Sequence, residues 1–232
     1  MGEVPSIITI DGPAASGKTT VGQALARQLG YLYFDTGAMY RAVTLVVLRR
    51  GIDPGDKKAV GEVAKSLTLD VVPPEVDDGR PYTVLADGED VTWAIRDEAV
   101  DANVSQVSKY GRVRKALTKQ QRRVGLRGNV VMMGRDIGTV VLPEADLKLY
   151  FDASAEVRAR RRWQERQERG EGDGFEAILE AMRRRDRIDS HRKHAPMRPA
   201  DDAIQIDTSD MTVDEVMARV RQLLAAVSNH SG

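Results

Sequence analysis

The chain has 232 residues, enough for one large domain with a sizeable buried core. Its 35 basic and 35 acidic residues balance to a formal net charge of zero, which argues against a general nucleic-acid binder. The absence of cysteine excludes a disulfide framework and a cysteine-ligated zinc site, and it fits a reducing cytoplasm. We expect neither a signal peptide nor a membrane span, because no apolar run approaches about 20 residues.

The first part of the chain alternates between strand and helix patterns. The β-branched run over residues 6–11 predicts a buried central strand, and apolar residues at helical spacing from Lys18 predict a helix that ends at Gly30. The sequence YLYF predicts a second strand, and the apolar pattern over residues 38–47 predicts a second helix. This alternation predicts parallel strands joined by right-handed crossovers.

The middle of the chain has a different pattern. Between residues 68 and 94, the turn signals Asp78-Gly79 and Asp87-Gly88 separate short β-rich runs. Three prolines in this stretch argue against a central parallel strand. We therefore expect a small antiparallel meander inserted into the α/β domain, followed by helices up to about residue 124.

The remaining strands and helices follow in order. VVMMGRDIGTVV (residues 130–141) is interpreted as the third parallel strand, LKLYFDA as the fourth and AIQID as the fifth. An arginine-dense helical segment, broken at GEGDG, lies between the fourth and fifth strands. Thr212 and Glu215 form a capping box that opens the last helix.

A phosphate-binding loop is the most specific motif. GPAASGKT fits G-x-x-x-x-G-K-T and stands between a predicted strand and a predicted helix, so a chance match is the weaker reading. Small residues let backbone N–H groups surround phosphate oxygens, Lys18 reaches the β- and γ-phosphates, and Thr19 offers its hydroxyl to Mg²⁺. The motif indicates a nucleoside triphosphate without naming the reaction. The expected ATP-binding residues here are Gly12, Pro13, Ala14, Ala15, Ser16, Gly17, Lys18, Thr19 and Thr20.

Two charged residues interrupt the apolar run of the third strand. Arg135 and Asp136 form either an internal ion pair or a pair of ligand-binding side chains. Gly134 allows the chain to turn at the carboxyl edge of the sheet, where ligands bind in open α/β folds. This position favours ligand binding.

Four further motifs carry a resemblance to a known family. They are DTGAMYR (35–41), SQVSKYGRVR (105–114), GRDIGTVV (134–141) and RDRIDSHRKHAP (185–196). With the phosphate-binding loop, and in this order, they resemble the bacterial cytidylate kinases, which are P-loop nucleoside monophosphate kinases. The resemblance covers residues 6–207.

The resemblance implies a fold and a reaction. The implied fold is α/β: a five-stranded parallel P-loop kinase core with helices on both faces, a small antiparallel β insertion and a helical, arginine-rich lid. The implied boundaries are 1–66, 105–156 and 194–232 for the core, 67–104 for the monophosphate-binding insertion, and 157–193 for the lid. The implied reaction transfers the γ-phosphoryl group of ATP to CMP or dCMP, giving ADP and CDP or dCDP.

The resemblance also implies roles for individual residues. Those that hold the acceptor phosphate are Thr36, where a serine is common, with Tyr40, Arg41, Arg135 and Arg192. Those that contact the base are Ser105, Arg114 and Asp136, and those that contact the sugar are Arg185 and Asp189. Arg161 and Arg162 fall near ATP, and the catalytic charges are those of Lys18, Arg135, Arg185 and Arg192.

Plain structural alternatives remain for several of these residues. Arg41 could be an ordinary exposed helix arginine, and Ser105 is supported by the family register alone. Arg114 has a near twin in Arg112, so an error of two positions is possible. Most lid arginines fit a solvated helical face, as the pair Glu165 and Arg169 illustrates.

The metal and the partners are inferred in the same way. Met133 stands where an acidic residue often precedes GRD, so Mg²⁺ would rest on Thr19, phosphates and water, with Asp35 or Asp11 further out. His191 and His194 lack a third ligand and are interpreted as surface residues. We expect a cytoplasmic monomer that binds ATP and CMP or dCMP, and neither nucleic acid nor membrane. A UMP or AMP kinase, or an RNA-binding P-loop ATPase, is the alternative.

Overall fold

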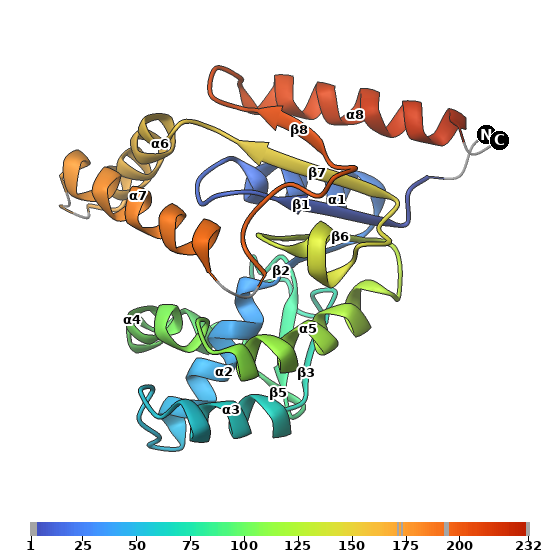
Figure 1. The fold of residues 1–232 in the computed structure, drawn as a ribbon. Helices are drawn as coiled ribbons and strands as arrows, with labels where there is room; N and C mark the ends of the chain where they lie inside the picture. The colour runs from blue at the N-terminus through green and yellow to red at the C-terminus, as the bar shows by residue number, and fades with distance from the viewer. Residues whose placement is uncertain (1–3, 171, 173, 193–194, 231–232) are drawn as a thin grey trace.

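A five-stranded sheet in which every strand is parallel to its neighbours forms the centre of the protein (Figure 1). The structure is a computed structural model that describes residues 4–170, 172, 174–192 and 195–230. The strand order is β2-β6-β1-β7-β8. The strands are β1 (Ile7–Asp11), β2 (Leu32–Asp35), β6 (Val130–Gly134), β7 (Leu147–Asp152) and β8 (Ile204–Asp207).

Helices pack around this sheet and extend away from it. α1 packs against β1, β6 and α8, and α5 packs against α3. The helices are α1 (Lys18–Leu29), α2 (Gly37–Arg49), α3 (Lys57–Ser66), α4 (Glu98–Val107), α5 (Gly111–Gly125), α6 (Ala155–Glu168), α7 (Phe175–His191) and α8 (Val213–His230), with a short 3₁₀ turn η1 (Ala94–Arg96). Among the described residues, no helix is both long and apolar enough to cross a membrane.

A small antiparallel sheet stands where the meander was predicted. It contains β3 (Leu69–Val72), β4 (Thr83–Ala86) and β5 (Glu89–Asp90). Asp87 and Gly88 join β4 to β5, and both have positive φ angles, of 50° and 87°. Two successive positive φ angles are what a tight hairpin turn requires, so the Asp-Gly signal was interpreted correctly.

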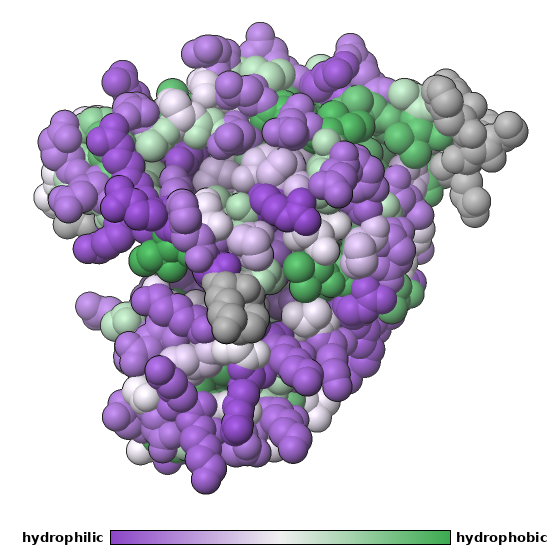
Figure 2. All heavy atoms as spheres, in the orientation of Figure 1, coloured by the Kyte–Doolittle hydropathy of each residue, from purple (hydrophilic) through white to green (hydrophobic). Residues whose placement is uncertain are grey.

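The hairpin of α6 and α7 has a hydrophobic cluster of its own, separate from the main core. Ala159, Ile178, Leu179 and Met182 form this cluster, and Ala15 of the phosphate-binding loop packs against it. Figure 2 shows the surface hollowed between this hairpin and α4. The two helices of the hairpin are therefore held together by apolar contacts of their own, and the hairpin also contacts the phosphate-binding loop.

Two features differ from the sequence-based expectation. Residues after Gly134 do not continue the strand, because Ile137–Val141 form a π-helical turn, η2. A Cβ at Gly134 would lie 2.6 Å from Ile137 Cδ1, so the glycine permits this turn. Helix α3 was not predicted, since its few buried apolar residues stand among charged ones; Asp56 caps it by accepting two backbone N–H groups.

Replacing Gly12 with alanine should destabilise the fold at the point where the phosphate-binding loop leaves β1. Gly12 has a φ of +138°, and an added Cβ would lie 2.0 Å from the Phe151 carbonyl oxygen. Gly30 also has a positive φ, of +69°, but an added Cβ would meet nothing within 4 Å. We expect urea denaturation to show losses of about 3 kcal/mol for Gly12→Ala and about 1 kcal/mol for the control Gly30→Ala. Equal losses would contradict the importance of the close approach to Phe151.

Candidate functional site

The phosphate-binding loop connects β1 to α1. Ala15 and Gly17 have positive φ angles, of 59° and 87°, which curl the backbone before the helix begins. No side chain caps the start of α1, so its first N–H groups remain available to an anion. This is the arrangement that the sequence motif predicted.

Lys18, the first residue of α1, is almost fully enclosed. Its side chain is 7% exposed, and its ammonium group donates to the carbonyl oxygen of Pro13 and, at 3.2 Å, to Ser16 Oγ. Burial, and then the positive charge of Arg135, lower the pKa of Lys18 to about 7. A phosphate group beside Lys18 would supply the negative charge that this ammonium lacks.

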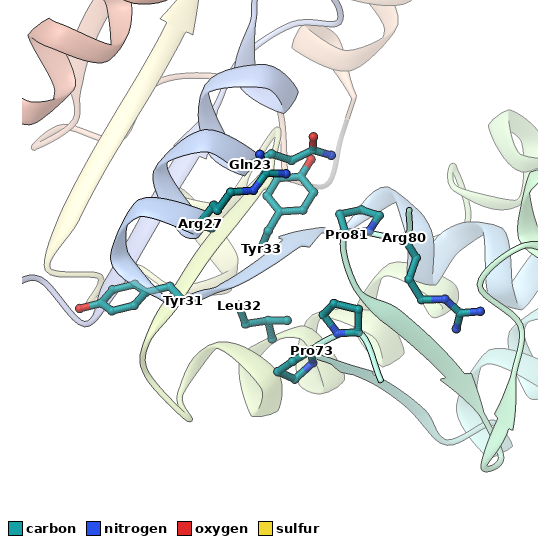
Figure 3. A pocket seen from close by; sticks show the side chains of 10 residues that line it. Gln23, Arg27, Tyr31, Leu32, Tyr33, Pro73, Arg80 and Pro81 are labelled. Atoms are coloured by element: carbon teal, nitrogen blue, oxygen red, sulfur yellow. The ribbon is translucent and has the colours of Figure 1, made fainter. Parts of the chain in front are cut away.

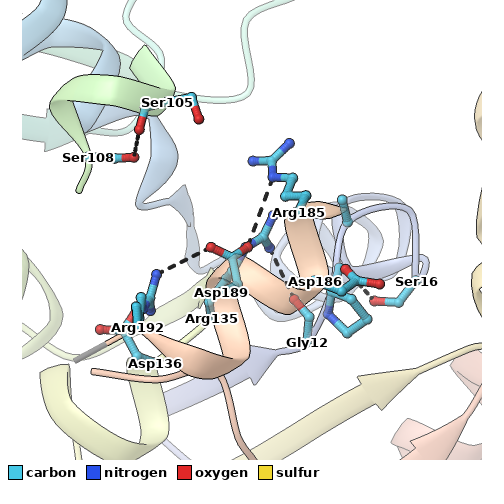
Figure 4. A network of polar contacts seen from close by, with 12 residues as sticks. Gly12, Ser16, Ser105, Ser108, Arg135, Asp136, Arg185, Asp186, Asp189 and Arg192 are labelled. Carbon is cyan, nitrogen blue, oxygen red and sulfur yellow. Dashed lines mark hydrogen bonds and ion pairs between the residues drawn. The ribbon is translucent and has the colours of Figure 1, made fainter. Parts of the chain in front are cut away.

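Arg135 and Asp136 turn away from each other at the end of β6 (Figure 4). Arg135 forms an ion pair with Asp189 of α7 and donates to the Gly12 carbonyl oxygen at 3.2 Å. Asp136 accepts hydrogen bonds from Arg114 at 2.8 Å and from Arg192 at 2.9 Å. The simple alternative of an Arg135–Asp136 pair is therefore wrong: each side chain is paired with another part of the chain.

Arg114 is held in a fixed orientation beside Asp136. The Arg114 guanidinium lies 5.5 Å from the centre of the Tyr40 ring, and Arg114 as a whole is 8% exposed. Its buried Nε has no hydrogen-bond partner among the described residues, which leaves a donor for a ligand acceptor. Arg112 instead pairs with Glu62 on the surface, so of the two arginines it is Arg114 that contacts Asp136.

The other predicted CMP-binding residues are not all gathered at this point. Thr36 donates from Oγ1 to the Met133 carbonyl oxygen at 3.0 Å, and Arg41 pairs with Asp101. Arg185 points outward, with its Nε 4.0 Å from Asp189. Ser105 is exposed on α4 and lies apart from the arginine cluster, in contact through its carbonyl oxygen with Ser108.

The two arginines predicted near ATP have different surroundings. Arg161 donates to the carbonyl oxygens of Ala15 at 3.5 Å and Thr208 at 2.5 Å. It also lines a pocket of about 290 Å³ between α6 and Ser209. Arg162 lies on the surface in an ion pair with Glu165, at 3.0 Å.

Arg158 is a buried residue that the sequence analysis missed. It is 4% exposed, pairs with Asp186 of α7 at 2.5 Å and donates to the Ala14 carbonyl oxygen at 3.4 Å. Arg158 therefore joins α6 to α7 and to the phosphate-binding loop. Within an arginine-dense helix, only the spacing of buried positions could have distinguished it.

The few oxygen atoms near the phosphate-binding loop fit a magnesium ion that would be held mainly by nucleotide phosphates and water. Thr19 is exposed at the start of α1, and Asp35 uses Oδ1 to accept the Gly37 N–H at 2.9 Å. The Met133 sulfur accepts a hydrogen bond from Tyr33, at 3.2 Å, and offers no oxygen. Mg²⁺ commonly keeps several waters and binds substrate phosphate oxygens, so it needs few protein ligands, and the Thr19 hydroxyl would be one of them.

Two remaining features lie outside this cluster. His191 is exposed and contacts the Arg187 carbonyl oxygen at 3.0 Å, while His194 lies outside the described residues. No group of three or more histidine, cysteine or acidic residues in the described part of the chain could hold a metal ion. A second pocket, of about 230 Å³, lies between Tyr33 and Pro81 and contains none of the predicted site residues (Figure 3).

The fold and the site together define a P-loop nucleotide-binding protein of the kinase type. A family model described as cytidylate kinase matches residues 8–226. The chain therefore belongs to the cytidylate kinase family.

Curated relatives agree with this assignment over almost the whole chain. A cytidylate kinase from Chloroflexus aggregans is 51% identical over 217 residues, covering 94% of this chain and 93% of the relative. Those from Herpetosiphon aurantiacus and Rhodococcus opacus are each 47% identical, covering 95% and 97% of this chain and 94% and 96% of the relatives. A solved gluconokinase from Sinorhizobium meliloti covers 98% of this chain and 96% of its own, but 15% identity and a TM-score of 0.48 add nothing to the assignment.

Replacing Lys18 with methionine should change how stability depends on pH. The pKa of Lys18 is about 7 in the folded protein, against an ordinary value of 10.5. Between these values the unfolded chain holds a proton that the folded protein has lost, so wild-type stability gains up to about 1.4 kcal/mol per pH unit. Urea denaturation should show the wild-type-minus-Lys18→Met difference rising by about 3 kcal/mol from pH 7 to about pH 9.5.

The exposed Lys65 on α3 provides the control for this measurement. Lys65→Met should show no such rise. A pH-independent difference between the wild type and Lys18→Met would contradict the inferred cost of burying the Lys18 ammonium.

Proposed function

We propose that the protein transfers the γ-phosphoryl group of ATP to CMP and dCMP, giving ADP and CDP or dCDP. The observation that supports this proposal most is the Arg114–Asp136 pair at the end of β6. Arg135, the residue before Asp136, contacts Gly12 of the phosphate-binding loop. A base-recognising group and a phosphate-binding group are thus neighbours in the chain. Membership of the cytidylate kinase family supports the same reaction.

The phosphate-binding loop is the proposed ATP side of the site. Its backbone N–H groups and Lys18 would hold the phosphates, and Mg²⁺, bound through Thr19, would offset their negative charge. Arg161 connects Ala15 of the loop with the pocket beside α6, which supports a position for the rest of ATP along this helix. Arg162 is more distant from the loop and would act only after a change of its side-chain position.

Arginine side chains are proposed to bind the acceptor phosphate. Arg135 follows β6 and Arg192 follows α7, and both form ion pairs with Asp189; Arg185 stands exposed on α7, also near Asp189. Arginine suits this task because its planar guanidinium binds phosphate oxygens in pairs and stays charged. Phosphoryl transfer depends chiefly on such positioning and charge stabilisation, and no general base is required for an already ionised phosphate. Thr36, Tyr40 and Arg41 would complete this set of phosphate contacts.

Asp136 and Arg114 are proposed to select cytosine. The cytosine N4 amino group donates to a carboxylate, and its N3 accepts from a guanidinium. A carboxylate has about four acceptor positions, so Asp136 can hold both arginines and still accept from N4. Uracil presents O4 to the carboxylate and N3–H to the arginine, so both contacts become repulsive. Ser105 would reach the base only if α4 approaches the cluster.

The α6–α7 hairpin is the proposed lid. Asp189 and Arg192 stand at its end and are bound to Arg135 and Asp136, the residues that we assign to CMP. CMP binding would therefore rearrange contacts that hold the lid, and closure would exclude water from the γ-phosphate. A monomeric, cytoplasmic enzyme without nucleic-acid or membrane partners stays a prediction.

A panel of acceptors tests the proposed function. With MgATP, CMP and dCMP should be phosphorylated with a kcat/KM at least about tenfold higher than that of UMP, because each buried mismatched contact costs about 1–3 kcal/mol. Equal use of UMP or AMP would favour a broader monophosphate kinase. ATP hydrolysis stimulated by single-stranded RNA, without transfer to a monophosphate, would favour the P-loop ATPase.

Replacing Asp136 with asparagine should weaken the choice of base specifically. The amide keeps the size of the side chain but removes the charge and presents an amino group that can face uracil O4. We expect kcat/KM for CMP to fall by about 10- to 100-fold, with a much smaller loss for UMP, in coupled assays of ADP release.

Asp70 offers a matched control. Its carboxylate also binds an arginine, Arg127, at 2.7 Å, but outside the site, so Asp70→Asn should leave the CMP-to-UMP ratio unchanged. An equal loss on CMP and UMP in Asp136→Asn would contradict the base-recognition role.

A further inference from the structure

A buried aspartate at the end of β1 stands behind the base-recognising residues. Asp11 is 4% exposed and is the last residue of the central strand. Its Oδ1 accepts the Ile137 N–H at 2.9 Å, and its Oδ2 accepts the Gly138 N–H at 2.7 Å. Both carboxylate oxygens are thus used to hold the first N–H groups of η2, directly after Asp136.

This arrangement departs from the usual way in which a helical turn begins. The residue before such a turn is Asp136, and an aspartate in this position commonly accepts the following N–H groups with its own side chain. Asp136 makes no such capping bond. Asp11, which belongs to the neighbouring strand, supplies the cap in its place.

Because Asp11 caps η2 in place of Asp136, it determines where the Asp136 carboxylate is directed. Because Asp11 satisfies Ile137 and Gly138, both oxygens of Asp136 remain available to Arg114 and Arg192. Ile137 and Gly138 are buried, so their N–H groups require an acceptor from the protein. Without the Asp11 carboxylate, the closest alternative in sequence is the side chain of Asp136 itself.

We propose that Asp11 is a positioning residue for base selection: by capping η2, it keeps the Asp136 carboxylate directed at Arg114 and at the base. Asp11 itself touches neither substrate. This inference rests on the proposed function, because it assumes that Asp136 recognises cytosine.

The electrostatics of Asp11 agree with a specialised role. Burial raises its pKa to about 6, although its two backbone hydrogen bonds and the charge of Lys18 lower it, and the nearby charge of Asp136 raises it further. A second carboxylate near Asp136 is unfavourable on charge grounds alone. The two hydrogen bonds that Asp11 accepts from η2 offset this repulsion. A neutral residue that cannot accept two N–H groups would lose at least one of these bonds.

Replacing Asp11 with asparagine tests the inference. The asparagine oxygen accepts one N–H group, but its amino group faces the other, so one buried donor loses its partner. We expect the CMP-to-UMP ratio of kcat/KM to fall by about tenfold or more, because the orphaned donor draws Asp136 away from Arg114. The loss of kcat/KM should be about tenfold larger for CMP than for UMP, because only the CMP contact depends on the direction of the Asp136 carboxylate.

Asp56 provides a matched control. It also caps a helix, α3, by accepting two backbone N–H groups, of Lys58 and Ala59, both at 3.0 Å. Both bonds end on Asp56 Oδ1, an oxygen that asparagine would keep, so the control variant is Asp56→Ala, which removes a cap away from the site; it should lower the melting temperature and leave the CMP-to-UMP ratio at the wild-type value. This control separates a general loss of stability from a loss of selection.

The outcomes separate this inference from the proposed function. A wild-type protein without preference for CMP would overturn the proposed function itself. A wild type that prefers CMP, with an Asp11→Asn variant that keeps the same ratio or loses activity equally on both substrates, would overturn only the inference. If Asp11→Asn does not fold, Asp11→Ser, which accepts one N–H without opposing the other, takes its place. Failure of both variants to fold would also overturn the inference, because Asp11 would then serve stability.

Discussion

The carboxylate of Asp136 lies between two guanidinium groups, and the rest of the site depends on this bridge. Arg114 comes from α5, and Arg192 directly follows α7, so the bridge joins parts of the chain that are far apart in sequence. Buried ion pairs of this kind add little to stability, since the cost of removing the charges from water offsets their attraction. Their presence at the carboxyl edge of the sheet is better explained by a ligand that needs them.

The charges around this bridge match a nucleotide monophosphate. Four arginines, Arg114, Arg135, Arg185 and Arg192, surround two carboxylates, those of Asp136 and Asp189, which leaves a local excess of two positive charges. A phosphate monoester carries a charge of about −1.5 to −2 at neutral pH. Asp189 pairs with Arg135, so a phosphate would replace one anionic partner of this arginine with another. In the proposed mechanism, this exchange would couple substrate binding to the position of the α6–α7 hairpin.

Local sequence patterns predicted the parts of the structure whose causes are local. The phosphate-binding loop, the parallel strands and the Asp87-Gly88 turn follow from short motifs with a direct steric or hydrogen-bonding reason. The helix α3 was missed because its apolar residues are sparse and its stability comes from packing against α5. The π-helical turn after Asp136 was missed because β-branched residues favour strands, and the cap that stabilises the turn is 126 residues away.

The ion-pair partners of the charged residues also could not be predicted from local sequence. Sequence placed Arg135 and Asp136 at the site but could not show that they diverge, to Asp189 and to Arg114, because such pairings depend on the assembled fold. It also could not separate buried Arg158 from the exposed arginines around it. Ser105, assigned from family register alone, remains apart from the cluster in this structure.

A crystal structure of the protein with CMP tests the central claim most directly. The account predicts the cytosine N4 within about 2.7–3.2 Å of Asp136, the N3 facing Arg114, and the phosphate against Arg135 and Arg192. A complex in which CMP is bound but its base lies away from Asp136, with the Arg114–Asp136–Arg192 bridge closed against it, would contradict the account.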